Sequence, residues 1–252
     1  GGDGTLPAGT IWADLYDPTA AEEQAVERVL GVDVPTPEEM RDLEASSRLY
    51  EENGAAYMTL TIVAGIDSGR PVTAAITFIL AGERLVTLRY ADPKPFRQFI
   101  AYAERHGAAT ASAPLVLAGL LEGITERIAE VLEDTGVELD ALSAALFAEP
   151  DPARKADHVH RDLRALMGRI GRTGDLVSKA RESLVSLSRL LAFAQQSGAA
   201  TLPSLMPGRL TTLARDVSAL ADHASYVSSK IAFLLDATLG LINIEQNAII
   251  KI

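Results

Sequence analysis

Residues 203–252 decide the fold, and they read PSLMPGRLTTLARDVSALADHASYVSSKIAFLLDATLGLINIEQNAIIKI. Apolar residues recur in this stretch at steps of three and four, the heptad spacing of a helix that packs along one face against other helices. The seam consists of Leu210, Leu213, Val217, Leu220, Ala224, Val227, Ile231, Leu234, Thr238 and Leu241. At about 1.5 Å per residue, one helix over this stretch would be about 75 Å long.

The end of this stretch, Ile249-Ile250-Lys251-Ile252, has none of the usual signals that stop a helix. It shows no C-terminal glycine, no following proline and no basic last turn. We therefore expect the helix to continue into a further, more hydrophobic segment.

Two more long helices are predicted before it, over residues 112–147 and 152–196, because both stretches repeat apolar residues with the same period. Pro150-Asp151-Pro152 separates them, and the short break predicts an antiparallel hairpin. Gly168, Gly171 and Gly174 lie inside the second helix. They indicate either close packing against a partner helix or a bend.

The first hundred residues have a different pattern, with short extended runs separated by turn signals such as Asn53-Gly54. Asp17-Pro18-Thr19 opens one predicted helix, and Thr36 with Glu39 forms a capping box for another. We expect a strand near residues 10–15 to join a later antiparallel meander across these helices.

The predicted fold class is α+β. A mixed, largely antiparallel sheet flanked by helices is expected over residues 1–107. An antiparallel helical hairpin is expected over residues 108–202, followed by one very long C-terminal stalk helix over residues 203–252.

Composition excludes several function classes. The net charge of −11 argues against a nucleic-acid partner, which would require a basic surface to neutralise phosphates. The absence of cysteine excludes disulfides and thiolate metal sites. We find no signal peptide and no run of about twenty apolar residues, so we expect a soluble chain without a bilayer span of its own.

No enzymatic chemistry is indicated by the motifs. The histidines His158 and His160 are two residues apart, whereas a helical zinc pair requires a spacing of four. Nucleophile elbows, phosphate loops and dinucleotide-binding glycine motifs are absent from the sequence. We expect neither a catalytic residue nor an organic cofactor.

Carboxylates gather on one face of the predicted helix 112–147, at Glu122, Glu126, Glu130 and Glu133. The face is either solvated and paired with basic residues, or it attracts cations. The next helix offers possible partners, which are Arg161, Arg164, Arg172 and Lys179.

Oxygen-bearing side chains share a face near the end of the stalk helix, because Asp236, Asn243 and Asn247 are seven and four residues apart. In a monomer this face would be solvated. In a parallel oligomer it would form rings of oxygen ligands along the axis, which suit strongly hydrated cations such as Mg²⁺.

Leu234-Leu235-Asp236, Asn247 and the apolar residues 249–252 resemble the stalk end of the CorA family of divalent-cation channels, which includes ZntB-like zinc transporters. Other pieces that occur in the same order as in that family are Trp12-Ala13-Asp14-Leu15, Asp17-Pro18-Thr19, Ser46-Ser47-Arg48-Leu49-Tyr50, Phe78-Ile79-Leu80 and Leu85-Val86-Thr87.

The resemblance implies the cytoplasmic regulatory and assembly domain of a transporter at the inner membrane, with the stalk helix leading into the first transmembrane helix. It implies a funnel-shaped homopentamer whose membrane segments, with a Gly-Met-Asn selectivity loop, are absent from this chain. Asp236 and Asn247 match pore-facing positions of the family, and Asn243 is added from helical phase alone.

The identity of the cation stays open at this point, between Mg²⁺ and Zn²⁺. Alignment from Asn247 places Thr212 where magnesium-sensing members have an acidic residue, and Asp216, one turn later, is a weak metal candidate. The alternative function is a soluble coiled-coil scaffold or adaptor whose α/β part binds another protein.

Overall fold

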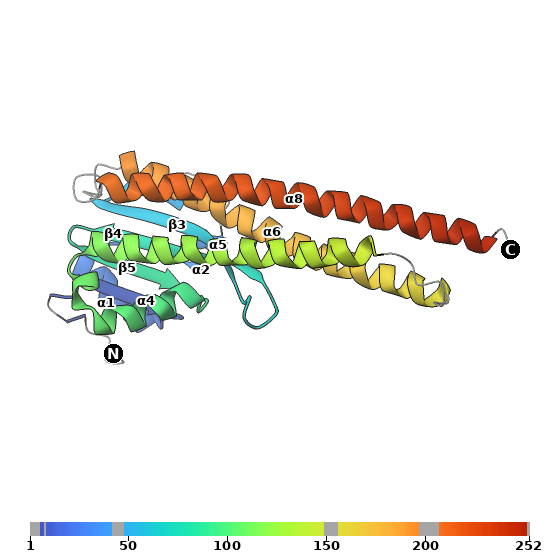
Figure 1. The fold of residues 1–252 in the computed structure, drawn as a ribbon. Helices are drawn as coiled ribbons and strands as arrows, with labels where there is room; N and C mark the ends of the chain where they lie inside the picture. The colour runs from blue at the N-terminus through green and yellow to red at the C-terminus, as the bar shows by residue number, and fades with distance from the viewer. Residues whose placement is uncertain (1–5, 8, 42–47, 149–155, 197–206, 251–252) are drawn as a thin grey trace. The chain divides into compact units, whose positions relative to one another are not determined.

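The computed structural model describes residues 6–7, 9–41, 48–148, 156–196 and 207–250. The chain forms two compact units (Figure 1). The sheet unit comprises Gly1–Ile128 and Glu182–Ala219, and the helical unit comprises Ala129–Arg181 and Leu220–Ile252.

A five-stranded mixed sheet forms the centre of the sheet unit, with the strand order β1-β5-β4-β3-β2. Strands β2 to β5 are an antiparallel meander, and β1 joins β5 in parallel, which confirms the predicted sheet. Asn53 and Gly54, both with positive φ, form the tight turn between β2 and β3. The strands are β1 (Trp12–Tyr16), β2 (Leu49–Glu52), β3 (Ala55–Ala64), β4 (Val72–Ala81) and β5 (Arg84–Arg89).

Short helices cover one face of this sheet, and the predicted capping box at Thr36 is confirmed. Thr19 caps α1 (Ala20–Leu30) and Thr36 caps α2 (Pro37–Met40), each in a capping box with a glutamate three residues later. Val26 and Met40 of these helices pack against a buried row of strand residues on that face, which includes Leu15, Tyr57, Ile79, Val86 and Leu88.

The other face of the sheet packs against α4 (Lys94–Arg105), which precedes a short 3₁₀ turn at Gly107–Thr110. Phe96 of α4 lies beside Phe78 of β4, with ring centroids 6.3 Å apart. Phe99 meets the ring of Trp12 edge-on at 5.6 Å. Side chains alternate along a strand, so Trp12, Asp14 and Tyr16 all lie on this face.

Three long helices follow, namely α5 (Ala113–Leu146), α6 (Ala156–Gln196) and α8 (Pro207–Ile250) (Figure 1). In the helical unit they share one apolar core, built from Leu139, Leu142, Leu146, Leu163, Ile170, Val177, Val227, Ile231 and Leu234. The predicted seam of α8 is confirmed, since eight of its ten positions are buried and Leu220 and Leu241 are half-buried.

The three glycines of α6 do not interrupt the helix, which is continuous from Ala156 to Gln196. A methyl group at Gly171 would meet no atom within 4 Å, whereas one at Gly174 would contact the Ile231 side chain of α8 at 3.4 Å. Gly174 therefore lies at a close contact between α6 and α8, whereas the space around Gly171 is open and Gly168 has only the Arg172 side chain of its own helix nearby, at 3.6 Å.

We expected no segment apolar enough to span a bilayer, but one stretch of α8 meets that criterion. Within residues 208–244, an 18-residue window reaches a mean hydropathy of 1.4, so the helix is long and apolar enough to cross a membrane by length and composition alone. The core helices of soluble proteins pass the same test. Only 22% of that window is buried, and the rest of it is half-buried or exposed in the single chain.

Candidate functional site

The exposed face of α8 contains the oxygen-bearing residues singled out in the sequence. Asp236, Asn243 and Asn247 are all exposed, whereas Leu234 is fully buried. Asp236 follows Leu234 by two residues, which places the two side chains about 200° apart around the helix. Asp222 and Ser229 extend the same row toward the N-terminus at steps of seven and are also exposed. One polar row therefore runs along the side of α8 that the single chain does not cover.

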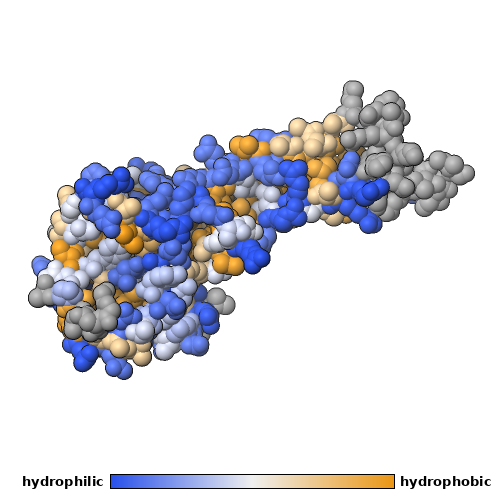
Figure 2. Space-filling model, turned by 90° about the horizontal axis from the view of Figure 1, so that it is seen from below, coloured by the Kyte–Doolittle hydropathy of each residue, from blue (hydrophilic) through white to orange (hydrophobic). Residues whose placement is uncertain are grey.

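Apolar side chains flank this row. Tyr226, Phe233, Leu239 and Ile244 of α8 are between 49% and 66% exposed. Figure 2 shows the molecule from below the view of Figure 1, where hydrophobic residues are scattered among mostly hydrophilic ones. An exposed helix face with a polar row and apolar neighbours is typical of a helix that packs against copies of itself.

Asp216, the weak metal candidate, is exposed on α8 one turn after Thr212. The Thr212 hydroxyl donates to the carbonyl of Gly208 at 3.0 Å, within its own helix. Over the described residues, no cluster of three or more His, Cys, Asp or Glu side chains could hold a metal ion. A metal at Asp216 would therefore need ligands from another chain or from water.

The acidic face of α5 has a basic partner, but from a different helix than expected. Arg209 of α8 binds Glu122 with two nitrogens, and its Nη2 lies 2.6 Å from Glu122 Oε2. The Glu122 carboxylate raises the pKa of Arg209, against the opposing effect of burial. Lys179 of α6, one of the expected partners, pairs with Asp175 of its own helix. The other acidic residues of the face, Glu126, Glu130 and Glu133, are exposed.

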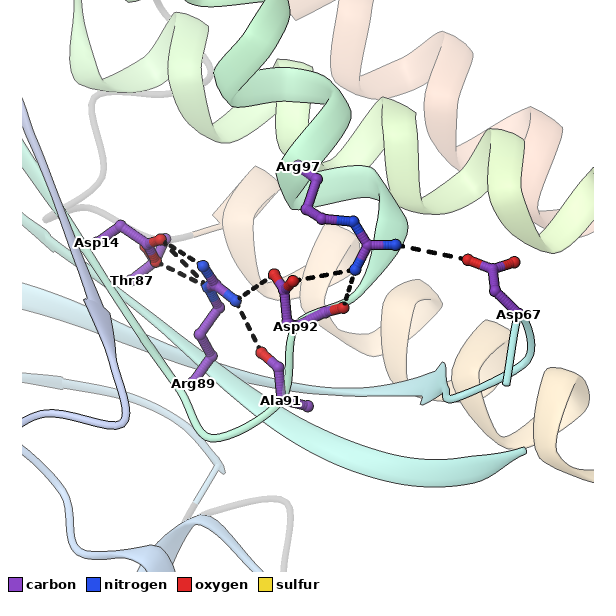
Figure 3. Close-up of polar contacts among 7 residues, drawn as sticks. All are labelled: Asp14, Asp67, Thr87, Arg89, Ala91, Asp92 and Arg97. Carbon is purple, nitrogen blue, oxygen red and sulfur yellow. Dashed lines mark hydrogen bonds and ion pairs between the residues drawn. The ribbon is translucent and has the colours of Figure 1, made fainter. Parts of the chain in front are cut away.

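A buried arginine forms a second polar centre, which sequence reasoning did not identify (Figure 3). Arg89, at the end of β5, is only 4% exposed. Its Nε and Nη2 donate to the Asp14 carboxylate at 3.0 and 2.8 Å, and its Nη1 donates to the carbonyl of Ala91 at 2.8 Å and to Asp92 at 3.0 Å. The guanidinium also lies 4.3 Å from the ring centroid of Tyr16.

The charge on Arg89 is maintained despite its burial. Burial opposes the charged form, but hydrogen bonds and the charge of Asp14, followed by those of Asp92, raise the pKa of Arg89 above its ordinary value. Asp14 also accepts a 2.7 Å bond from the Thr87 hydroxyl, which in turn accepts the indole N–H of Trp12 at 3.0 Å. The cluster therefore joins β1 to β5 through side chains as well as backbone.

The ion pairs continue outward from Asp92 along the surface (Figure 3). Arg97 of α4 donates to the Asp92 carboxylate at 3.0 Å and lies 3.5 Å from Asp67, in the turn between β3 and β4. Asp67 also pairs with Arg127 of α5 at 2.7 Å. This chain of charges joins two strands, a turn and two helices, which is a structural role rather than a catalytic one.

Comparison with known proteins identifies the family, because the model of CorA-like Mg²⁺ transporter proteins matches residues 7–252. The chain belongs to the CorA family. It is 30% identical over 243 residues to the magnesium transport protein CorA of Haemophilus ducreyi, a match that covers 96% of this chain and 73% of that protein. Family members are ion transporters, which agrees with the expectation that this chain is not an enzyme.

Solved structures of CorA-family proteins have the same fold. The complete structure of the CorA magnesium transporter from Methanocaldococcus jannaschii matches with a TM-score of 0.75 at 18% identity, over 98% of this chain and 75% of that one. The ZntB cytoplasmic domain from Vibrio parahaemolyticus matches with a TM-score of 0.61 at 12% identity, over 92% of this chain and 87% of that one. The predicted α+β class with long C-terminal helices is therefore confirmed.

Proposed function

We propose that this chain is the cytoplasmic regulatory and assembly part of a CorA-type divalent-cation transporter at the inner membrane. The observation that carries the proposal is the exposed polar row of α8, together with membership of the CorA family. The H. ducreyi protein and the M. jannaschii structure each have about a quarter of their length outside the match. We assign the membrane-spanning part of the transporter to that remainder.

In the intact transporter, five copies of α8 surround a common axis and turn their polar rows toward it. Asp236, Asn243 and Asn247 then form rings of oxygen atoms on the cation path. The flanking Tyr226 and Phe233 pack between neighbouring copies. The carboxylates of a ring repel one another unless cations or water lie between them, which couples assembly to the presence of cations.

The cation is Mg²⁺, with Zn²⁺ as the alternative. Carboxylate and amide oxygens without thiolate or imidazole suit Mg²⁺, which keeps much of its water shell. In the funnel, the acidic face of α5 at Glu126, Glu130 and Glu133 would raise the local cation concentration. Asp216 would bind a regulatory ion between neighbouring copies.

Flux measurements on the full-length transporter test the role of Asp236. The variant Asp236→Asn, reconstituted in liposomes, is expected to transport Mg²⁺ more slowly and to discriminate less between Mg²⁺ and Zn²⁺. The matched control is Asp134→Asn, because Asp134 is an exposed carboxylate of α5 outside the α8 row. Unchanged flux and selectivity in Asp236→Asn would exclude its place on the cation path.

The mass of the assembly tests the oligomer separately. Light scattering on the full-length protein in detergent, with and without Mg²⁺, is expected to give five subunits. A dimer in both conditions, with no heat of Mg²⁺ or Zn²⁺ binding in calorimetry, would instead favour the scaffold function.

A further inference from the structure

Three glycines lie inside α6, at Gly168, Gly171 and Gly174. Compared with alanine, each lowers the equilibrium constant of helix formation at its position by about fivefold. None of the three has the positive φ that requires glycine. Gly174 lies against Ile231 of α8, whereas Gly168 and Gly171 are exposed and a methyl group would fit at both. Within the described part of the chain, neither packing nor backbone conformation therefore requires a glycine at these two positions.

A hydroxyl group weakens the same part of α6 in a second way. The Thr173 hydroxyl donates to the backbone carbonyl of Arg169 at 3.0 Å, four residues earlier in the helix. In a regular helix that carbonyl accepts the backbone N–H of Thr173, so two donors share one acceptor. Hydroxyl bonds of this kind slightly destabilise helices and often bend them. Two independent features thus weaken α6 between residues 168 and 174.

The packing of α6 also changes at these glycines. After them, every turn of the helix has a buried residue, namely Val177, Ala180, Leu184, Leu187, Leu191 and Ala194. From residue 161 to residue 174, a stretch that the structure describes completely, only Leu163 and Ile170 are buried. A segment with few buried apolar contacts opens more readily than a well-packed one. The glycines therefore lie where a firmly held part of α6 meets a loosely held part.

We infer that residues 168–174 are a bending point of α6, about which the first part of the helix, residues 156–167, changes direction. Sharp bends of helices are found at glycines and at residues that disturb the backbone hydrogen bonds, and this segment contains both. Leu163 and Leu166 of the first part share an apolar core with Leu234 of α8. A bend at the glycines therefore changes the contact between α6 and the end of α8, while the well-packed part of α6 keeps its contacts.

The ion pair of this part of α6 allows such a movement. Arg169 pairs with Glu138 of α5 at 2.7 Å, but the two side chains are 44% and 39% exposed. Exposed ion pairs of this kind contribute little to stability and are readily exchanged for water. The bend is a property of the helical unit and is independent of the cation path in the proposed function.

Amide hydrogen exchange in the full-length transporter tests the bending point. After correction for the intrinsic rate of each residue type, exchange at residues 168–174 is expected to be faster than at residues 161–167 and 175–181 on either side. Exchange that instead increases steadily toward residue 156 would indicate fraying of the helix end and would overturn the inference. Protection at residues 168–174 equal to that of both neighbouring segments would overturn it as well.

Alanine variants make the test specific. The double variant Gly168→Ala/Gly171→Ala fits into the available space, so it is expected to slow exchange at residues 168–174 by about tenfold or more and to leave the assembly intact. The control Gly136→Ala of α5 also meets no atom within 4 Å and is expected to change that exchange by less than about twofold. Unchanged exchange in the double variant would overturn the inference. A smaller assembly mass in light scattering would also overturn it, because the glycines would then provide room for a neighbouring chain.

Discussion

The buried ion pair between Arg89 and Asp14 leads to the most stringent prediction about stability. The variant Asp14→Asn keeps one oxygen, which still accepts from Thr87, but it places an amide N–H₂ where Asp14 Oδ2 accepts from Arg89 Nη2 at 2.8 Å. Donor then faces donor, beside a guanidinium that is 4% exposed. The variant therefore loses a charge-assisted bond and leaves a buried charge without its main partner.

The expected loss of stability depends on the hydrogen bonds that Arg89 keeps in the variant. Breaking a buried ion pair costs about 3–5 kcal/mol, and Arg89 keeps its bonds to Ala91 and Asp92, so we expect a loss of about 3 kcal/mol in the free energy of unfolding. For a domain of this size that corresponds to a decrease of about 6–12 °C in Tm.

Urea unfolding followed by tryptophan fluorescence measures this loss. Trp12 is the single tryptophan of the chain, and its indole N–H is bonded to Thr87 inside the same cluster. The control Asp67→Asn affects the pairs with Arg97 and Arg127, in which the Asp67 side chain is 56% exposed, so it is expected to cost at most about 2 kcal/mol. High salt should diminish the effect of the control and leave that of Asp14→Asn unchanged.

The double variant Asp14→Asn/Arg89→Met provides an independent test of the same reasoning. It removes the buried charge together with its partner, so its cost should be smaller than the sum of the two single costs. A loss of less than about 1 kcal/mol in Asp14→Asn, or strict additivity in the cycle, would refute a stabilising role for the pair.

Four further variants have defined outcomes. Gly119→Ala should reduce stability by about 1–3 kcal/mol because its methyl would overlap the ring of Phe99, whereas Gly136→Ala on the same helix meets no atom within 4 Å and should stabilise by about 0.5–1 kcal/mol; thermal unfolding distinguishes them. Ser186→Ala should cost about 1–3 kcal/mol in urea unfolding, since it leaves a buried backbone N–H of β3 without its acceptor. Burial raises the pKa of Tyr50 from 10.0 to about 12, so the neutral phenol is favoured in the folded chain. The associated stability is complete below pH 10.0 and is lost as the pH rises through about 12, and Tyr50→Phe should abolish this loss in alkaline urea titrations.

The sequence predicted well those helix starts, seams and turns that depend on residues close together in the chain. The capping box at Thr36 and the helix start at Asp17-Pro18-Thr19 each lie within a few residues of chain, and the seam of α8 depends only on helical period. The turn at Asn53-Gly54 predicted the hairpin between β2 and β3 for the same reason.

Interactions between distant residues were not predictable in this way. Asp14 and Arg89 are 75 residues apart, and they meet because β1 pairs with β5 in a register that places Asp14 beside Thr87. Nothing in the spacing of either residue indicates that register. The possible partners of the acidic face were sought on the next helix for the same reason, whereas Glu122 pairs with Arg209, 87 residues away on α8. The pore-facing role of Asp236, Asn243 and Asn247 stays a prediction, because a single chain does not contain the neighbours that would define an axis.

The edge of β3 has a consequence for solubility. Strand β3 extends six residues beyond its pairing with β2, and an uncovered edge of that length would offer backbone groups to a strand of another molecule. Helix α6 lies beside this edge, and the Ser186 hydroxyl accepts the backbone N–H of Thr61, which is then not available to an incoming strand. In the folded chain, α6 and Ser186 therefore take the place of a neighbouring strand at this edge.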